Sequence, residues 1–459
     1  IGSPSQSAQA GVETTDTPNG VEVSWNQSGS AEIIKVLVDG QEVATLTEVS
    51  ESVTIGASED STISVVGVKD DGEQVISETE TEYDTGNGTV EEYNAETETV
   101  SGSVSINPPI PNATVKSISN ETVIDTVTTD SGGQFTINAK SNSRLQVIVT
   151  GFEYDGNPEL YASNEVNITD TSESVSVEFD STNARVASVN GNSIWVINSE
   201  GEEGSKTIGS VEQLQSIPSE SSNDYKLVSN IDASPTSSWN SGSGFEPINI
   251  GSANFNGNNY TISDLYIDRG SELQVGLFEG TSGSVRNLTL ENPDITGQEN
   301  VGGVAGLIAG DDTTVQNVSV SGGTISSTEN GLQVSTGGIA GTYDGTDLSN
   351  ISSSATVNGE DFTGGLFGRI TKDDDVTIQF QDSSFSGTVT GGKNVGGLIG
   401  RNTGARLSNT YMTGDVTGNV NVGGLVGAAY RNTTNSYSNG FVTANTENVG
   451  GLIGFLENG

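Results

Sequence analysis

A short glycine-rich phrase recurs through the last third of the chain and limits what this part can fold into. Each copy reads Val or Thr, then Gly-Gly, an apolar residue, one variable residue and a third Gly. From the first Gly of one copy to that of the next, the steps are 35, 27, 32, 27 and 27 residues, a period of 27 with insertions of eight and five. Such a period is typical of stacked-repeat proteins, whose units bury their apolar side only against their neighbours. The copies occupy residues 301–306, 336–341, 363–368, 395–400, 422–427 and 449–454.

Each repeat has room for three short strands. After the Gly-Gly phrase come a polar turn, a segment such as Leu407–Met412 and an alternating piece such as Gly414–Gly418. A propeller blade needs about 40 residues or more, so the sequence predicts a right-handed parallel β-helix. We expect the apolar residues that follow Gly-Gly, among them Leu398, Leu425 and Leu452, to form one buried column along its axis.

The segment Gly396–Gly418 resembles the GLUG repeat of bacterial and archaeal surface proteins, and the resemblance extends over about residues 205–459. It implies a surface-exposed β-helix of the kind often found in adhesins, with no shared catalytic residue. Together with the lead-in before it, this domain is assigned to residues 182–459. The segments that resemble the usual first coils of such domains are 208–214, 225–232, 244–248 and 255–265.

The N-terminal part reads as a flexible lead, residues 1–17, followed by a small β-sandwich at 18–85. Its strands alternate apolar and polar residues, and the pairs Asp39-Gly40 and Asp71-Gly72 suit tight hairpin turns. The opening Ile1–Gln6 followed by this sandwich resembles the soluble part of haloarchaeal type IV pilins; an immunoglobulin-like sandwich is the other interpretation. The pilin resemblance implies a filament subunit.

A second β-sandwich is predicted at residues 99–181, after an acidic, Thr/Gly-rich linker at 86–98. Its order of motifs, Gly-x-Val, then Pro-x-x-Ala-x-Val, then Thr-Asp-x-x-Gly-x-Phe, resembles the carboxypeptidase-regulatory-like, transthyretin-like domains. This resemblance implies a spacer without chemistry of its own. The fold class is therefore all-β: two small sandwiches followed by a β-helix.

The charge of the chain restricts its partners. It carries 61 acidic and 16 basic residues, a net charge of −45, which repels nucleic acid and anionic membranes. Concentrated salt screens such charge over a few Å, so a halophilic archaeon is the expected source, and an ordinary acidic secreted protein is the alternative. The chain has no Cys and no His, which excludes disulfides and thiolate metal sites and removes the commonest general base.

Ten Asn-x-Ser/Thr sequons are the candidate modification sites. On an extracellular archaeal protein they are glycan acceptors, although a chain rich in Asn, Ser and Thr also generates sequons by chance. Asn287 and Asn317 lie between apolar residues, so an inward hydrogen-bonded ladder is the alternative for them. The ten are Asn26, Asn87, Asn112, Asn120, Asn167, Asn259, Asn287, Asn317, Asn350 and Asn432.

No cofactor is predicted, and calcium is the one metal that the sequence leaves open. The acidic runs Asp70–Asp71, Asp311–Asp312 and Asp373–Asp375 offer oxygen ligands, but none has the spacing of a known calcium loop. Arg369 and Lys372 lie beside the last run, and we place them on a loop insertion rather than on a repeating strand. A polysaccharide-active β-helix enzyme is therefore the alternative function, to be favoured by a groove with converging carboxylates and a basic residue.

The sequence as a whole favours a non-enzymatic structural or adhesive protein, extracellular or on the cell surface. The expected partners are copies of the chain in a filament, other surface proteins and surface glycans, with no nucleic acid. The sequence stops five residues after the last Gly-Gly phrase without a polar cap, so either the natural chain continues or this end stacks on another subunit, and we expect the second in part.

The charge generates the first prediction. With a net charge of −45, self-repulsion should make the chain unfold more easily in dilute buffer than in molar NaCl, where the charges are screened. The measurement is a series of thermal melts from low to molar NaCl, and Tm should rise along the series. A constant or falling Tm would remove the halophile argument.

Overall fold

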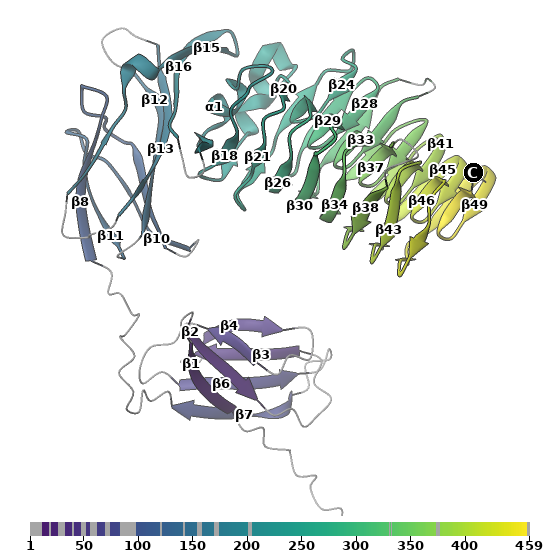
Figure 1. The fold of residues 1–459 in the computed structure, drawn as a ribbon, viewed down its shortest axis with the longest axis horizontal. Helices are drawn as coiled ribbons and strands as arrows, with labels where there is room; N and C mark the ends of the chain where they lie inside the picture. Colours follow the sequence, from purple (N-terminus) through teal and green to yellow (C-terminus); the bar gives the residue numbers. More distant parts are fainter. Residues whose placement is uncertain are drawn as a thin grey trace, which may run out of the picture. The chain divides into compact units, whose positions relative to one another are not determined.

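The structure is a computed structural model that describes two compact units, within Ile1–Glu96 and Thr97–Gly459 (Figure 1). In the first unit it describes only the strands between residues 12 and 82. In the second it describes residues 98–456, apart from short gaps. These gaps are 120–121, 141–142, 154–157, 169–173, 201–203, 330, 332 and 373–376.

The first unit contains two small antiparallel sheets with strand orders β1-β2-β5 and β4-β3-β6-β7. Strands β3 and β4 pair antiparallel, and both predicted turns, at residues 39–40 and 71–72, lie outside the described residues. The expectation of a flexible lead over residues 1–17 is wrong for its last part, because β1 pairs along its length with β2; its β-branched Thr residues favour such a strand. The strands are β1 (Val12–Thr17), β2 (Gly20–Trp25), β3 (Ile33–Val38), β4 (Gln41–Leu46), β5 (Ser52–Ile55), β6 (Thr62–Val68) and β7 (Gln74–Glu82).

The second unit begins with a β-sandwich of a six-stranded and a three-stranded sheet, ordered β10-β9-β12-β13-β16-β15 and β11-β8-β14. Alternate residues of these strands, such as Val104, Phe135 and Val147, meet between the sheets in one core. The elements are β8 (Glu98–Ser105), β9 (Thr114–Ser119), β10 (Thr122–Thr128), β11 (Gln134–Ala139), β12 (Arg144–Phe152), β13 (Leu160–Asn167), β14 (Val175–Glu178), the 3₁₀ helix η1 (Ser181–Asn183), β15 (Arg185–Val189) and β16 (Asn192–Asn198).

Strand β16 faces two cores. Trp195 and Ile197 on one side pack into the sandwich, whereas Ile194 and Val196 on the other side belong to the core of the repeat region. The strand also pairs with β13, which makes it part of the sandwich sheet. The solenoid strands thus start at β17, later than the assigned boundary at residue 182, and the β15–β16 hairpin covers the first coil.

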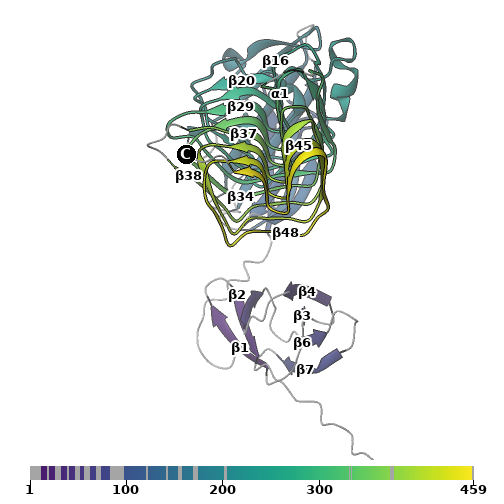
Figure 2. The same ribbon diagram turned by 90° about the vertical axis from the view of Figure 1, so that its right-hand side faces the viewer.

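The remainder of the chain is a parallel β-solenoid, which confirms the predicted fold class (Figures 1 and 2). One sheet contributes a single strand to each of eight turns. It consists of β20 (Ile248–Gly251), β25 (Phe278–Thr281), β29 (Ala305–Ala309), β33 (Ala340–Asp344), β37 (Phe367–Ile370), β42 (Ile399–Asn402), β46 (Val426–Ala429) and β50 (Ile453–Leu456).

Two further sheets complete the walls of the solenoid, and two short helices, α1 (Val211–Gln215) and η3 (Ser234–Gly242), lie in its first coils. The 14-stranded sheet consists of β17 (Lys206–Ile208), β18 (Tyr225–Leu227), β19 (Ile231–Asp232), β21 (Phe255–Asn256), β22 (Thr261–Ser263), β26 (Val285–Glu291), β30 (Thr314–Ser321), β34 (Asp347–Ser353), β38 (Ile378–Gln381), β39 (Ser384–Phe385), β43 (Ala405–Ser408), β44 (Tyr411–Met412), β47 (Thr433–Thr434) and β48 (Tyr437–Ser438). The 12-stranded sheet consists of β23 (Tyr266–Asp268), β24 (Gln274–Val275), β27 (Asp294–Gly297), β28 (Asn300–Gly302), β31 (Thr324–Ser327), β32 (Ser335–Gly337), β35 (Thr356–Asn358), β36 (Phe362–Gly364), β40 (Thr388–Thr390), β41 (Lys393–Gly396), β45 (Asp415–Gly423) and β49 (Val442–Gly450).

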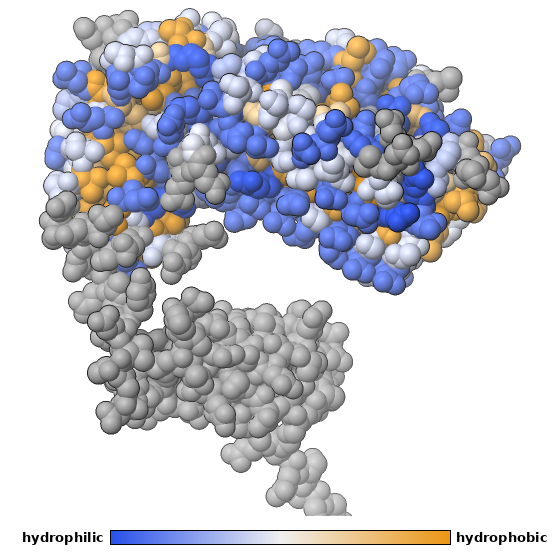
Figure 3. Space-filling model, in the orientation of Figure 1, coloured by the Kyte–Doolittle hydropathy of each residue, from blue (hydrophilic) through white to orange (hydrophobic). Residues whose placement is uncertain are grey.

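The register of the stack follows the sequence repeat. The first Gly of each phrase pairs with the first Gly of the next, from Gly302 to Gly450. Leu398 and Leu425 are fully buried, as the predicted column requires. Leu452 is 42% exposed because it belongs to the last coil, on which no further coil packs; the same end shows as an apolar patch in Figure 3.

The third Gly of the phrase lies where two strands of adjacent coils come closest. A Cβ atom on Gly400 would lie 2.5 Å from the backbone nitrogen of Thr363 in the preceding coil. A Cβ atom on Gly368 or on Gly427 would likewise lie 2.4 Å from a backbone atom of the coil before. No side chain fits at these distances, so the repeated Gly permits the chain to fold back on itself in every coil.

Polar side chains join the sandwich to the solenoid. The hydroxyl of Ser163 on β13 donates to that of Thr207 on β17, 2.8 Å away, and both residues are fully buried. Lys226 on β18 forms a buried ion pair with Glu165 on β13, and the hydroxyl of Tyr260 donates to Gln146 on β12 at 3.1 Å. Buried polar groups cost free energy unless they are paired in a fixed geometry, so these contacts fix how the two parts meet.

The close contact of Gly400 yields the second prediction. The substitution Gly400→Ala should reduce the free energy of unfolding by about 1–3 kcal/mol, because the added methyl group overlaps backbone atoms that cannot move apart. The control is Gly451→Ala, since a Cβ atom there would have no neighbour within 4 Å. Denaturant unfolding in molar salt measures both variants, and equal stability of the two would refute this account of the phrase.

Candidate functional site

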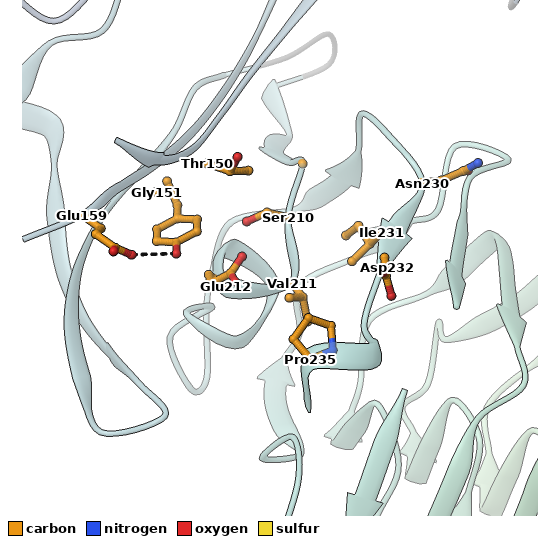
Figure 4. Close-up of a pocket in the computed structure, with 12 residues that line it drawn as sticks. Thr150, Gly151, Glu159, Ser210, Val211, Glu212, Asn230, Ile231, Asp232 and Pro235 are labelled. Atoms are coloured by element: carbon orange, nitrogen blue, oxygen red, sulfur yellow. Dashed lines mark hydrogen bonds between the residues drawn. The ribbon is translucent and has the colours of Figure 1, made fainter. Parts of the chain in front are cut away.

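A pocket of about 490 Å³ lies at the junction of the sandwich and the first coils (Figure 4). The end of β12 and the start of β13 supply one wall, with Thr150, Glu159 and Tyr161. The start of α1 supplies Ser210 and Glu212, and the segment from β19 to η3 supplies Asn230, Ile231, Asp232 and Pro235. The pocket exists because the sheet containing β13 continues past the point where the first coil turns away.

Burial changes the acidity of two groups in this pocket. The hydroxyl of Tyr161 donates to a carboxylate oxygen of Glu159 at 2.9 Å, shown as the dashed line in Figure 4. Burial, followed by the negative charge of Glu212, raises the pKa of Tyr161 well above its usual range, so the hydroxyl keeps its proton. Burial also raises the pKa of Glu212, although a hydrogen bond from Ser210 opposes this shift.

The chemistry of the pocket is that of three carboxylates with neutral hydrogen-bonding groups. Glu159, Glu212 and Asp232 contribute acceptors, and none of its lining residues is Lys or Arg. Such a lining suits the hydroxyl groups of a neutral sugar or a cation. Within the described residues, no three acidic side chains converge closely enough to hold a metal ion. The pocket therefore meets the expectation for a polysaccharide-active enzyme in part: it contains carboxylates but lacks the expected basic residue.

Four of the described sequons lie away from any common site. Asn112, Asn167, Asn259 and Asn432 are exposed, at turns or strand ends of different parts of the second unit. Asn26, Asn87 and Asn120 lie outside the described residues. The sequence therefore marks accessible acceptors that the structure does not bring together.

Three sequons, in contrast, stand directly above one another. Asn287, Asn317 and Asn350 occupy the same corner of successive coils, with φ between 52° and 53°, a conformation that Asn tolerates better than most residues. The side-chain amide of each donates to the side-chain oxygen below it, at distances of 2.8 to 3.1 Å, starting at Asn256. The hydrogen-bonded ladder is thus formed, but Asn317 and Asn350 remain exposed, so the ladder runs along the surface of the solenoid.

The acidic runs differ in what the structure shows. The ammonium group of Lys372 lies 3.8 Å from Asp311 and 3.4 Å from Asp344, so one of these runs contributes to ion pairing. Asp70–Asp71 and Asp373–Asp375 lie outside the described residues. The placement of Arg369 on a loop insertion is wrong: it lies in β37 and pairs in register with Arg401 of β42, because the insertion begins after Ile370.

Aromatic groups around these two arginines were not recognised from the sequence. Arg369 and Arg401 both lie over the ring of Phe362, and Arg401 also lies over the ring of Tyr430. The signal was present, since each Arg follows the third Gly of its phrase directly in two consecutive repeats.

The helices in the described part of the chain are too short or too polar to cross a bilayer.

Comparison with known proteins places these features in context. Residues 391–417 match the GLUG motif. This stretch has the length of one repeat, from directly after β40 into the start of β45.

One curated relative is Halomucin of Haloquadratum walsbyi, 41% identical over 131 residues. The match covers 27% of this chain and 1% of Halomucin, so this chain corresponds to a small part of that protein. A solved structure described as a "putative immunoglobulin A1 protease" from Bacteroides ovatus is 16% identical, with a TM-score of 0.41, over 56% of this chain and 85% of that one. The motif and the Halomucin match together point to a surface protein of a halophile.

The raised pKa of Glu212 yields the third prediction. The folded chain holds this proton more tightly than the unfolded chain, so ionisation of Glu212 lowers stability increasingly as pH rises from its ordinary pKa of 4.5. The variant Glu212→Gln should therefore have a higher Tm than the wild type at neutral pH. The difference should vanish below about pH 4.5.

Thermal melts of both proteins across this pH range in molar salt measure the effect. The exposed Glu291 supplies the control variant Glu291→Gln, which removes the same charge from the solenoid surface. A Tm difference between wild type and Glu212→Gln that is independent of pH would contradict the assignment.

Proposed function

We propose that this chain is an extracellular structural and adhesive protein on the surface of a halophilic archaeon, in which a solenoid is displayed on a stiff sandwich. The observation that carries the proposal is strand β16, which belongs to the sheet of the sandwich and to the core of the solenoid. A joint with a shared strand transmits orientation from one part to the other. A protein that must hold a binding surface away from a cell benefits from this stiffness.

The surface chemistry supports the same function. The net charge of −45 keeps the chain soluble in concentrated salt, and the face of the solenoid in Figure 3 is mainly hydrophilic. The similarity to Halomucin and the GLUG motif support a surface location. A pilin-like filament subunit is the more specific form of this proposal, and it is supported by the resemblance of the N-terminal sequence.

Glycosylation is part of the proposal. Among the described sequons, Asn112, Asn167 and Asn259 are the preferred acceptors because they are exposed and their amide groups do not form the ladder. A glycan on Asn287, Asn317 or Asn350 would be attached to the nitrogen that donates to the coil below.

A polysaccharide-active enzyme is the second candidate. The pocket with Glu159 and Glu212 favours it, because glycoside hydrolysis uses two carboxyl groups, one of them with a raised pKa. Incubation with neutral and acidic polysaccharides, followed by a reducing-end assay, distinguishes the candidates. Release of new ends that stops in Glu159→Gln and Glu212→Gln would replace the adhesive function with an enzymatic one.

The fourth prediction tests the surface function directly. In a halophilic archaeal host that expresses the full natural gene, protease added to intact cells should remove the chain, and beads coated with the purified chain should bind to such cells in molar salt. Beads coated with a scrambled-surface acidic protein of equal charge are the control. A chain that is protected in intact cells, or beads that bind no better than the control, would refute the proposal.

A further inference from the structure

The Gly-Gly bends bring side chains of two sheets close together. The third Gly of each phrase packs against backbone of the strand that precedes the bend in the coil before. Side chains of these two strands are therefore neighbours. The hydroxyl of Thr342 donates to Asn300 at 2.8 Å, and in the next coils Arg369 and Arg401 reach across to Phe362. The strand β37 that carries Arg369 lies in the middle of the solenoid (Figure 1).

Two guanidinium groups lie against aromatic rings beside the bend. Arg369 and Arg401 are paired residues of adjacent strands, and their central carbons lie 5.7 and 5.6 Å from the centre of the Phe362 ring. Arg401 also lies 5.3 Å from the centre of the Tyr430 ring and donates to its hydroxyl at 2.9 Å. The rings attract the positive charges and hold the two planar groups in fixed positions.

Neither positive charge has a negative partner among the described residues. No carboxylate there lies within 4.0 Å of either guanidinium, whereas five other cations, at Arg144, Lys206, Lys226, Arg269 and Lys372, are paired. Arg369 donates one hydrogen bond to Gln333, and its Nε atom is buried without an acceptor. Asp361, whose charge acts on Arg369, is itself buried and accepts from the backbone of Gln333 and the amide of Asn394.

This arrangement is costly without a ligand. Burial and the adjacent charge of Arg401 lower the pKa of Arg369, which means that its surroundings disfavour the charged form, even though Asp361 opposes the shift. The chain has only 16 basic residues against 61 acidic ones, and two of these few cations nonetheless lie side by side. An anion that bridges both guanidinium groups would supply the missing acceptor and offset their repulsion.

We propose that Arg369 and Arg401 form a binding site for the carboxylate or sulfate group of an acidic polysaccharide. This inference rests on the proposed adhesive function and names its ligand class. Arginine forks match the planar oxygens of such groups and form two hydrogen bonds at once. A partly buried pair is also screened less than an exposed one, so the site remains effective in concentrated salt.

The groups around the arginines favour a sugar over a simple ion or an acidic peptide. The hydroxyl of Tyr430 and the side-chain amide of Gln333 border the two guanidinium groups. These neutral groups can form hydrogen bonds with the hydroxyl groups of a sugar. Chloride has no hydroxyl groups, and an acidic peptide does not present them beside its carboxylates.

The fifth prediction tests this site by titration of the full chain in molar KCl with labelled oligogalacturonate, dextran sulfate, neutral dextran and polyglutamate. The wild type should bind one or both acidic sugars, and Arg369→Gln/Arg401→Gln should weaken this binding about tenfold or more, because charged hydrogen bonds are lost. Arg401→Lys keeps the charge but loses the fork, and it should weaken binding too. Neutral dextran should not bind.

The matched control is Arg286→Gln/Arg406→Gln, which removes two exposed arginines from another sheet of the solenoid and should change binding less than twofold. Thermal melts establish that each variant is folded. The inference fails if no acidic sugar binds, if the control weakens binding equally, or if polyglutamate binds as tightly as the sugars. Absence of acidic-sugar binding by a wild-type chain whose coated beads still adhere to cells would refute this ligand while leaving the surface function standing.

Discussion

The close approach of backbone at the Gly-Gly bend is the constraint on which the rest of the structure depends. Because the third Gly of one coil touches backbone of the coil before it, every coil must stack in the same register. This register places the apolar residues in one continuous core and the polar corner residues in columns. The Asn ladder and the arginine pair are both consequences, since each requires equivalent residues of successive coils to lie one strand spacing apart.

Much of this could be predicted from the sequence. The spacing of the phrase set the strand pairing from Gly302 to Gly450, and the burial of Leu398 and Leu425 followed from it. Such repeats are informative because the same residue types recur at equivalent positions of several coils. The extra strand β1 was missed because its polar composition resembles a linker.

The joint and the candidate sites were less accessible to prediction. Strand β16 reads as an ordinary apolar run, and nothing in its sequence shows that its two faces belong to different cores. The junction pocket combines residues from β12, β13, α1, β19 and η3 that are up to 85 positions apart, from Thr150 to Pro235. The pairing of Arg369 with Arg401 was hidden by the five-residue insertion between their repeats, although the third Gly before each provided a frame.

The shared strand β16 has a further consequence for how the stack is built. A coil in the middle of a solenoid is templated by its neighbour, and the first coil ordinarily has none. Here the β15–β16 hairpin supplies Val189, Ile194 and Val196 as a preformed apolar floor before the repeats begin. The sandwich precedes the repeats in the chain, so during synthesis it provides a nucleus on which each coil is added in the order in which it is made.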